Sequence, residues 1–423
     1  MISASRTLAL AVVAALGLSA CGTSAATSST AAADDGTTLT IWTRAATETV
    51  SKAYADAYNA GHKNKVKVTA YPNEEYPAKL ASAAGAKALP DMFASDVVFA
   101  PQYASQGLWL DITARLGGSA VKDKVAPAHV RNATWKGKNY AIPHTIDMSV
   151  MLYNKDLFTK AGLDPDKPPT TLTQFADDAR AVNKLGGDVH GTYFGGNCGG
   201  CNVFTMWPSV WAGGGSVMSD DGTTSTINSP QMAAVFALYR KLYEEGVAAP
   251  ASKDEAGPTW LDALQSGKIG IAPGPAVWLG LIESKATFKL GVAPISGIDG
   301  GESTFVGGDV LGISATSKHA DQAWDFLSWT MSDEAQVEVI AKNKGVPTRT
   351  DLAANKYSSA DPRLVEINNL MAKGKTPYAA NFNATYNDPQ SPWITTFRGA
   401  FFGDATKALS DGATALTASL RQH

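Results

Sequence analysis

The alternation of strand and helix patterns constrains the fold of this chain more than any other sequence feature. Residues 38–43 and 65–70 have the composition and alternation of β-strands. Between them, apolar residues recur at helical spacing from Val50 to Tyr58, and Gly61 is a typical helix end. This strand–helix–strand order predicts a βαβ unit, in which the two strands run parallel.

Later segments continue the same alternation. Thr171 and Gln174 have the spacing of a capping box at the start of a helix that reaches Val182. A buried strand is predicted over residues 91–95, and further helices are predicted over 78–87, 230–245 and 320–342. The sequence therefore predicts an α/β protein with mostly parallel sheets, and 423 residues are too many for one typical core but suit two large lobes.

The N-terminal residues are typical of an exported protein. The apolar run over residues 8–18 is shorter than the roughly 20 residues needed to cross a bilayer, but it suits a signal peptide. Leu18-Ser-Ala-Cys21 resembles a bacterial lipoprotein cleavage site, which predicts a signal peptide over 1–20 and a lipid anchor on Cys21. An ordinary signal peptide with a coincidental Cys is the alternative. Residues 21–37 are small or polar and predict a flexible linker. The signal peptide and the lipid anchor together predict a protein that lies outside the cytoplasm and is anchored to the cell membrane.

Charge and motif content argue against several function classes. The net charge is −3 and no cluster of five Lys and Arg residues occurs, so nucleic acid is not an expected partner. The six His residues include no His-x-x-x-His pair, no Ser is centred in Gly-x-Ser-x-Gly, and Gly374-Lys-Thr lacks the earlier Gly of a phosphate loop. We therefore expect no enzyme activity, no metal and no cofactor.

Cys198 and Cys201 lie three residues apart in a Gly-rich segment. Outside the cytoplasm this spacing favours a small disulfide loop, with a redox pair or half of a metal site as the alternatives. We expect the disulfide to stiffen the segment that carries Asn202, Phe204 and Trp207.

Several stretches together carry a resemblance to a known family. They occur in the family's order over nearly the whole chain after the linker, and they include residues 39–43, 89–93, 142–158, 162–171, 267–271, 307–313, 323–327, 332–336 and 345–349. The chain resembles extracellular solute-binding protein family 1, the sugar-binding lipoproteins of ABC importers, which include maltose-binding proteins.

This resemblance implies two Rossmann-like lobes of the periplasmic-binding-protein type II architecture, joined by three crossings near residues 145–149, 301–306 and 341–346. Lobe one would hold residues 38–146 and 304–342, and lobe two residues 147–303 and 343–423. The implied function is capture of a mono- or oligosaccharide by hinge closure between the lobes, and its delivery to a membrane permease. We expect a monomer.

The family's ligand positions, and the stiffened segment, indicate candidate ligand contacts. The alternative is a solvated surface residue for Arg44 and a core aromatic residue for Trp393. The candidates are Thr43, Arg44, Tyr76, Asp96, Asp147, Asn202, Phe204, Trp207, Trp278, Asp309, Trp393 and Arg398. Two positions depart from the family's pattern. Trp278 comes two residues later than the aromatic residue of many relatives, and Asp309 replaces an aromatic residue, which favours extra hydroxyls or an amino group on the ligand.

Aromatic rings and carboxylates together suit a carbohydrate, because a pyranose has an apolar C–H face and equatorial hydroxyls that need hydrogen-bond partners. Two alternatives stay open. One is a secreted carbohydrate-active enzyme, since 39 acidic residues always offer a pair of carboxylates. The other is a two-lobed binder of a non-sugar solute such as iron, a polyamine or phosphate.

Overall fold

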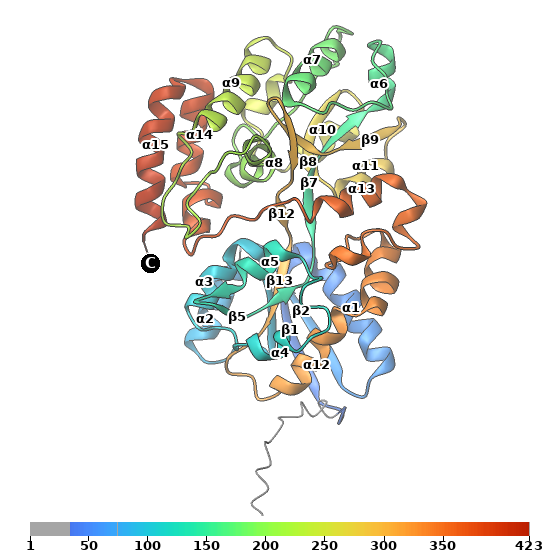
Figure 1. Ribbon diagram of the computed structural model, residues 1–423, viewed down its shortest axis with the longest axis vertical. Helices are drawn as coiled ribbons and strands as arrows, with labels where there is room; N and C mark the ends of the chain where they lie inside the picture. The colour runs from blue at the N-terminus through green and yellow to red at the C-terminus, as the bar shows by residue number, and fades with distance from the viewer. Residues whose placement is uncertain (1–33, 74, 423) are drawn as a thin grey trace, which may run out of the picture. The chain divides into compact units, whose positions relative to one another are not determined.

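The computed structural model describes residues 34–73 and 75–422, and Figure 1 shows their course. Five strands form the first sheet, in the order β2–β1–β3–β13–β6. Their bounds are β1 Thr38–Arg44, β2 Lys65–Tyr71, β3 Met92–Asp96, β6 Ile142–Pro143 and β13 Asp309–Ile313. Strand β1 runs parallel to β2 and β3, as the βαβ pattern predicts, whereas β13 runs antiparallel to both of its neighbours.

The second sheet is built around β7 (Asp147–Asn154), which pairs antiparallel with β8 (Ile271–Pro275), β9 (Leu290–Ala293) and β12 (Val306–Gly307). The prediction of mostly parallel sheets is therefore wrong for this sheet. The chain enters it from the first sheet through β7 and leaves toward the first sheet through β12, so these two strands run in opposite directions. Two hairpins complete the strands: β4 (Thr134–Trp135) with β5 (Lys138–Asn139), and β10 (Ile295–Gly297) with β11 (Gly300–Ser303).

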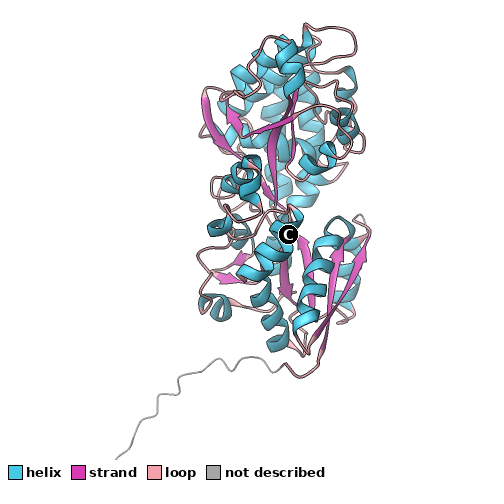
Figure 2. Cartoon of the chain, turned by 90° about the vertical axis from the view of Figure 1, so that its right-hand side faces the viewer, coloured by secondary structure: helices cyan, strands magenta, loops and turns pink. Residues whose placement is uncertain are grey.

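Helices surround the strands of both sheets (Figure 2). Helix α1 (Glu48–Gly61) buries Tyr54 and Tyr58 on the face that it turns toward the first sheet, as the apolar spacing predicts. The other helices are α2 Tyr76–Gly85, α3 Ala100–Ser105, α4 Thr113–Gly117, α5 Pro127–Asn132, α6 Lys155–Lys160, α7 Leu172–Asn183, α8 Gly199–Ala212, α9 Pro230–Glu244, α10 Trp260–Gln265, α11 Trp278–Glu283, α12 Ala320–Thr330, α13 Pro362–Leu370, α14 Pro392–Phe402 and α15 Ala405–Leu420.

The predicted start of one helix is confirmed, whereas the predicted length of another is wrong. The capping box is confirmed, because the hydroxyl of Thr171 accepts a hydrogen bond from the amide of Gln174 at 2.9 Å and begins α7. The single helix predicted over 320–342 is wrong. Helix α12 ends at Thr330, and the hydroxyl of Ser332 accepts from the amide of Ala335 at 3.2 Å, which starts a separate π-helical segment. The apolar spacing continues through this break, and a cap inside it overrides the helical pattern.

Two connections between the sheets lie side by side. The chain leaves the first sheet after Pro143 and begins β7 at Asp147, and it returns to the first sheet between Gly307 and Asp309. This return lies a few residues after the crossing predicted over 301–306, because residues 306 and 307 still pair with β7.

The backbones of these two connections are hydrogen bonded to each other. The amide of Asp309 donates to the carbonyl of Thr145 at 3.1 Å, and the amide of His144 donates to the carbonyl of Asp309 at 2.8 Å. Between the two sheets, Gly308 has φ +104°, and a Cβ on it would lie 2.2 Å from the carbonyl oxygen of Thr145. Only glycine fits this close approach of the two backbones.

A third connection follows α12. The amide of Ala126 donates to the carbonyl of Thr348 at 2.8 Å, and the amide of Thr350 donates to the carbonyl of Lys124 at 2.7 Å. Helix α13, which comes next, packs against β7 and β9 of the second sheet. The chain therefore leaves the elements around the first sheet for the last time in this region.

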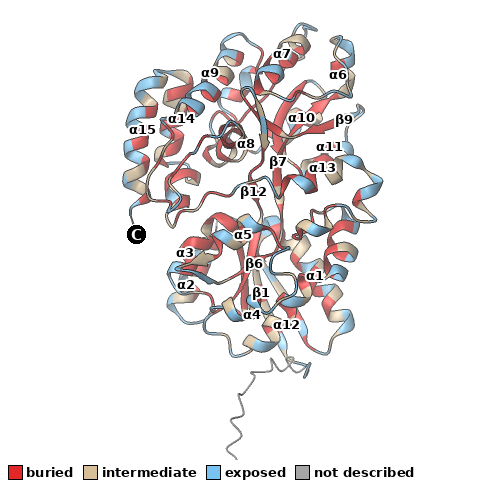
Figure 3. Cartoon of the chain, viewed as in Figure 1, coloured by how far each residue is buried: buried red, intermediate tan, exposed pale blue. Residues whose placement is uncertain are grey.

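The central strands β3, β7, β9 and β13 are buried over nearly their whole length, whereas β2 at the edge of the first sheet is mostly exposed or intermediate (Figure 3). The largest wholly buried side chains of the second half include Trp207, Trp260 and Trp393. Within the described residues, none of the helices combines the length and the apolar character that crossing a bilayer demands.

Candidate functional site

A cavity of about 570 Å³ is lined by residues from both sheets and from the connections between them. Its volume lies in the range of small-molecule sites. From the first half come Arg44, Ala46, Thr47, Val50, Asp96 and Val98, and from the connections come residues 144–147, 307–308, 340 and 345–346. From the second half come residues 200–201, 203–205, 257, 260, 275, 277–278, 305, 382 and 387.

Strand topology brings three charged residues together at one edge of the first sheet. Arg44 ends β1 and Asp96 ends β3, and the carboxyl ends of parallel strands meet at the same edge. Asp309 begins the antiparallel β13 and is in register with Asp96. This is the edge at which open α/β sheets bind ligands.

The three residues form an ion cluster. The Nε and Nη2 atoms of Arg44 donate to Oδ1 of Asp309 at 2.8 and 2.5 Å, and its Nη1 lies 3.2 Å from Oδ2 of Asp96. Thr47 donates its hydroxyl to Oδ2 of Asp309 at 2.8 Å. Burial opposes the charge of Arg44, but the carboxylates of Asp309 and Asp96 raise its pKa above the ordinary value. Burial raises the pKa of Asp96, and Arg44 partly offsets this shift.

Asp147 lines the cavity at the start of β7, and its environment differs from that of the ion cluster. The amides of Met148 and Val277 donate to its Oδ1 at 2.9 and 3.3 Å. Burial raises the pKa of Asp147 to about 7, against which the backbone amides and the more distant Arg44 act weakly. The carboxylate therefore changes its charge near neutral pH.

Aromatic side chains form the apolar part of the wall. Trp278 is half-buried, and its ring lies 6.0 Å from that of Trp260 in an edge-on arrangement. The rings of Phe204 and Phe305 lie 5.2 Å apart and also line the cavity. The cavity thus offers flat apolar surfaces beside charged hydrogen-bonding groups.

Of the predicted ligand residues, Arg44, Asp96, Asp147, Phe204 and Trp278 line the cavity. Asp309 lies behind Arg44 and is wholly buried, so its carboxylate reaches Arg44 and Thr47 rather than the cavity. The remaining predicted residues do not line the cavity. They are Thr43, Tyr76, Asn202, Trp207, Trp393 and Arg398.

Two of the three predicted tryptophans pack against each other inside the second half of the chain. Trp207 and Trp393 are wholly buried, with ring centroids 5.5 Å apart, and Tyr386 lies 4.9 Å from Trp207. The indole N–H of Trp393 donates to the carbonyl of Gly199 at 3.1 Å. These rings stabilise the interior, which is the alternative given for Trp393.

Two predicted residues of the first half have structural contacts instead. Thr43 is buried, and its hydroxyl lies 2.8 Å from that of Thr47. Tyr76 donates its hydroxyl to the carbonyls of Ala94 and Trp42 at 2.7 and 2.9 Å, which ties α2 to two strands. Both side chains support the edge that carries Arg44.

Two predicted residues of the second half also lie away from the cavity. Asn202 is wholly buried within α8. Arg398 donates to the carbonyls of Gly196 and Lys253 at 3.1 and 2.9 Å and lies 3.4 Å from Asp254. Arg398 therefore joins two loops behind the disulfide.

Several lining residues were not predicted from the sequence. Trp260 begins a short helix with no motif around it, and Phe305 precedes a two-residue strand. Thr47 falls in a single 3-10 turn between β1 and α1, where it supports Asp309. The position of Thr47, three residues after a strand end, is the one signal that pointed toward this edge of the sheet.

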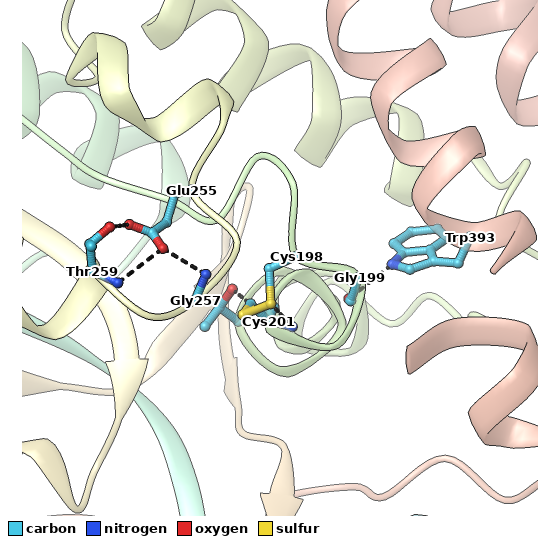
Figure 4. The surroundings of a disulfide bond; sticks show 8 residues. Cys198, Gly199, Cys201, Glu255, Gly257, Thr259 and Trp393 are labelled. Carbon is cyan, nitrogen blue, oxygen red and sulfur yellow. Dashed lines mark hydrogen bonds between the residues drawn. A yellow bond between two sulfur atoms is a disulfide. The ribbon is translucent and has the colours of Figure 1, made fainter. Parts of the chain in front are cut away.

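A disulfide joins Cys198 and Cys201 at the start of α8, with Cα atoms 5.2 Å apart (Figure 4). Cys201 lines the cavity, and a Cβ on Gly257 would lie 3.5 Å from its sulfur. The loop of Gly257 is held by Glu255, which accepts hydrogen bonds from the amide of Gly257 at 2.6 Å and from the hydroxyl of Thr259 at 2.5 Å. The disulfide thus packs against a fixed loop at the cavity wall.

Across the part of the chain that the structure describes, no three His, Cys, Asp or Glu side chains gather in a way that could hold a metal ion. The charged groups of the cavity are instead paired with each other or with backbone amides. The arrangement suits hydrogen bonding to a polar ligand.

Comparison with known proteins identifies the family. Residues 53–366 match the sequence profile of a family described as bacterial extracellular solute-binding protein, and this match spans most of the chain. The chain belongs to this family. As a solute-binding protein it is assigned to a class that binds its ligands rather than converting them, and that acts outside the cytoplasm.

Among curated relatives of this solute-binding protein, the diacetylchitobiose binding protein DasA of Streptomyces coelicolor is 28% identical over an alignment of 367 residues, which covers 84% of this chain and 83% of the relative. The galactooligosaccharide-binding protein of Bacillus subtilis is 23% identical and covers 84% of this chain and 86% of the relative. The crystal structure of the cyclic alpha-maltosyl-1,6-maltose binding protein of Arthrobacter globiformis has a TM-score of 0.79 at 23% identity, and covers 91% of this chain and 99% of that one. This likeness confirms the predicted fold class.

Proposed function

We propose that the solute-binding protein captures a carbohydrate, as a mono- or oligosaccharide, in the described cavity and delivers it to the membrane permease of an ABC importer. The observation that carries the proposal is the presence, in one cavity, of the half-buried ring of Trp278 beside Arg44, Asp96 and Asp147. A pyranose packs its C–H face on such a ring, while its hydroxyls bond with the charged groups. The sugars in the relatives' names support the same ligand class.

Capture would proceed by closure of two lobes. Arg44 and Asp96 belong to the first sheet, whereas Asp147 and Trp278 belong to the second half. A ligand that contacts both sets binds best when they approach each other, so it shifts the equilibrium toward a closed form. We propose residues 38–146 with 304–342 as one lobe and residues 147–303 with 343–423 as the other. Residues 304–307 still pair with β7, so the exchange between sheets is completed at Gly308.

The N-terminal predictions fall on residues 1–33, outside the described residues, and on the start of the described chain. We propose that residues 1–20 are removed as a signal peptide, that Cys21 becomes lipidated, and that residues 21–37 act as a linker to the cell membrane. We also propose that the protein is a monomer and that the Cys198–Cys201 disulfide stays oxidised outside the cytoplasm.

A thermal-shift screen against mono- and oligosaccharides tests the function. A sugar at about 100 times its dissociation constant adds about 2.7 kcal/mol to the free energy of unfolding and raises the melting temperature. Chromatography of the recovered sugar is expected to return it intact, whereas consumption would favour a carbohydrate-active enzyme. Small-angle scattering with the same sugar is expected to give a smaller radius of gyration, and an unchanged radius contradicts closure.

Replacing Trp278 with Ala is expected to weaken sugar binding by about 10- to 100-fold, because the ligand loses about 1.5–3 kcal/mol of apolar contact. The melting temperature of the free protein should change little, since Trp278 is only half-buried. Calorimetric titration measures the affinity. Trp135→Ala is the matched control, because Trp135 is also half-buried and lies outside the cavity. Equal affinity losses in both variants would contradict the assignment of Trp278.

Sugar binding is expected to weaken as the pH falls. The carboxylate of Asp147 has a pKa raised to about 7 by burial, and it accepts hydroxyl hydrogen bonds best when ionised. A bound sugar that uses this carboxylate lowers its pKa, so affinity should fall from about pH 8 to about pH 5, by at most about tenfold per unit. Titrations across this range measure it. Asp147→Asn should bind more weakly and give a flatter profile, and identical profiles for both proteins would refute the role of Asp147.

A further inference from the structure

The charges at the cavity do not balance. Of the described residues that line it, Arg44 and His144 are the basic ones, and burial keeps His144 neutral by lowering its pKa to about 4. Arg44 is shared between Asp309 at 2.5 Å and Asp96 at 3.2 Å. The ion cluster therefore carries one net negative charge before Asp147 is considered.

When it is ionised, Asp147 adds a second negative charge without a counterion. No Lys, Arg or His of the described residues forms an ion pair with it, and its hydrogen-bond donors are the neutral amides of Met148 and Val277. Burial raises the pKa of Asp147 to about 7, which is the behaviour of a carboxylate whose charge is not compensated. A neutral ligand that displaces water from this carboxylate leaves the charge uncompensated.

The surroundings of Asp147 suit an ammonium group on a sugar ring. Val277, whose amide holds the carboxylate, is followed directly by Trp278, and the ring of Trp260 lies 6.0 Å from that of Trp278. Aromatic faces attract cations as well as pyranose C–H groups.

We propose that the captured carbohydrate is an amino sugar, with its protonated amine on the carboxylate of Asp147 and its ring against Trp278. This inference rests on the proposed function, because it names the class of carbohydrate that the same cavity takes. Asp309, which the sequence suggested for this role, is satisfied by Arg44 and Thr47 and does not reach the ligand. The role falls instead to the carboxylate that lacks a partner.

Calorimetric titration with matched sugar pairs tests the proposal. Glucosamine is compared with glucose, galactosamine with galactose, and fully deacetylated chitobiose with cellobiose, so that only the substituent at one or two ring carbons differs. In the pair whose skeleton fits, the aminated sugar is expected to bind at least about tenfold more tightly than its neutral partner, as one charge-assisted hydrogen bond provides.

Asp147→Asn is expected to bring the ratio of the two affinities, aminated over neutral sugar, close to one. The Asn side chain has the same size as Asp but carries no charge. Asp178→Asn is the matched control. Asp178 in α7 also has a pKa raised by burial, to about 6, but it lies outside the cavity, so the preference should persist. Thermal unfolding of both variants establishes that they are folded.

The outcomes separate this inference from the function on which it rests. Neutral sugars that bind as tightly as their aminated partners, or a preference that survives Asp147→Asn, overturn the amino-sugar assignment and leave carbohydrate capture standing. A chain that binds no sugar of either kind overturns both.

Discussion

Replacing Trp393 with Ala is expected to lower the free energy of unfolding by about 3–5 kcal/mol, the range for large aromatic side chains removed from a core. The ring is wholly buried against Trp207, and its N–H donates to the carbonyl of Gly199 at 3.1 Å. Sugar affinity of the folded variant should stay within a few fold of the parent, because Trp393 does not line the cavity. Urea unfolding and calorimetric titration measure the two effects.

Trp393→Phe is the control, since it keeps a ring and removes the hydrogen bond. Trp393→Phe should lower the free energy of unfolding clearly less than Trp393→Ala does. The lost hydrogen bond should account for about 0.5–1.5 kcal/mol of the decrease. A Trp393→Ala variant that keeps its stability but loses sugar binding would mean that this ring contacts the ligand, as the resemblance implied.

Removing the carboxylate of Asp309 is expected to have a comparable effect. Asp309→Ala should lower the free energy of unfolding by about 3 kcal/mol, the lower end of the range for a broken buried ion pair, because Asp96 still partners Arg44 at 3.2 Å. Sugar affinity should fall as well, since Arg44 loses the group that fixes its position at the cavity wall. Unfolding and titration of the same preparation test both expectations.

A double variant separates the charge from the packing. Asp309→Leu combined with Arg44→Met is expected to lower the free energy of unfolding by less than the sum of the two single changes, and the difference from that sum measures the coupling of the two side chains. Asp96 lacks Arg44 in both variants that carry Arg44→Met, so its lost contact cancels in this comparison. Strict additivity of the two single changes in a double-mutant cycle would show that the ion pair contributes no coupling energy.

Local sequence patterns predicted much of the fold. The βαβ unit and the cap at Thr171 depend on neighbouring residues, and the structure contains both. The antiparallel second sheet depends instead on where the chain crosses between sheets, which no local pattern encodes. The helix predicted over 320–342 is interrupted because Ser332 competes for a backbone amide inside an otherwise continuous apolar pattern.

The candidate site was predictable where strand ends determine it. Arg44 and Asp96 follow parallel strands, and topology brings such residues together at one edge. The aromatic residues were not predictable in this way. A tryptophan on an apolar helix face has the same pattern whether it faces the interior, as Trp207 does, or a cavity, as Trp260 does. Which of these two environments a tryptophan faces depends on packing between distant segments.

The two hydrogen-bonded connections at Thr145 and Gly308 limit how the halves of the described chain move. Two strands joined by cross-links behave as a flat ribbon, which bends across its thin dimension but resists shearing of one strand along the other. Closure of this protein would therefore be a rotation about one axis that lies across the ribbon. Under the proposed closure, any ligand large enough to obstruct that single swing would be held while the two halves stayed apart.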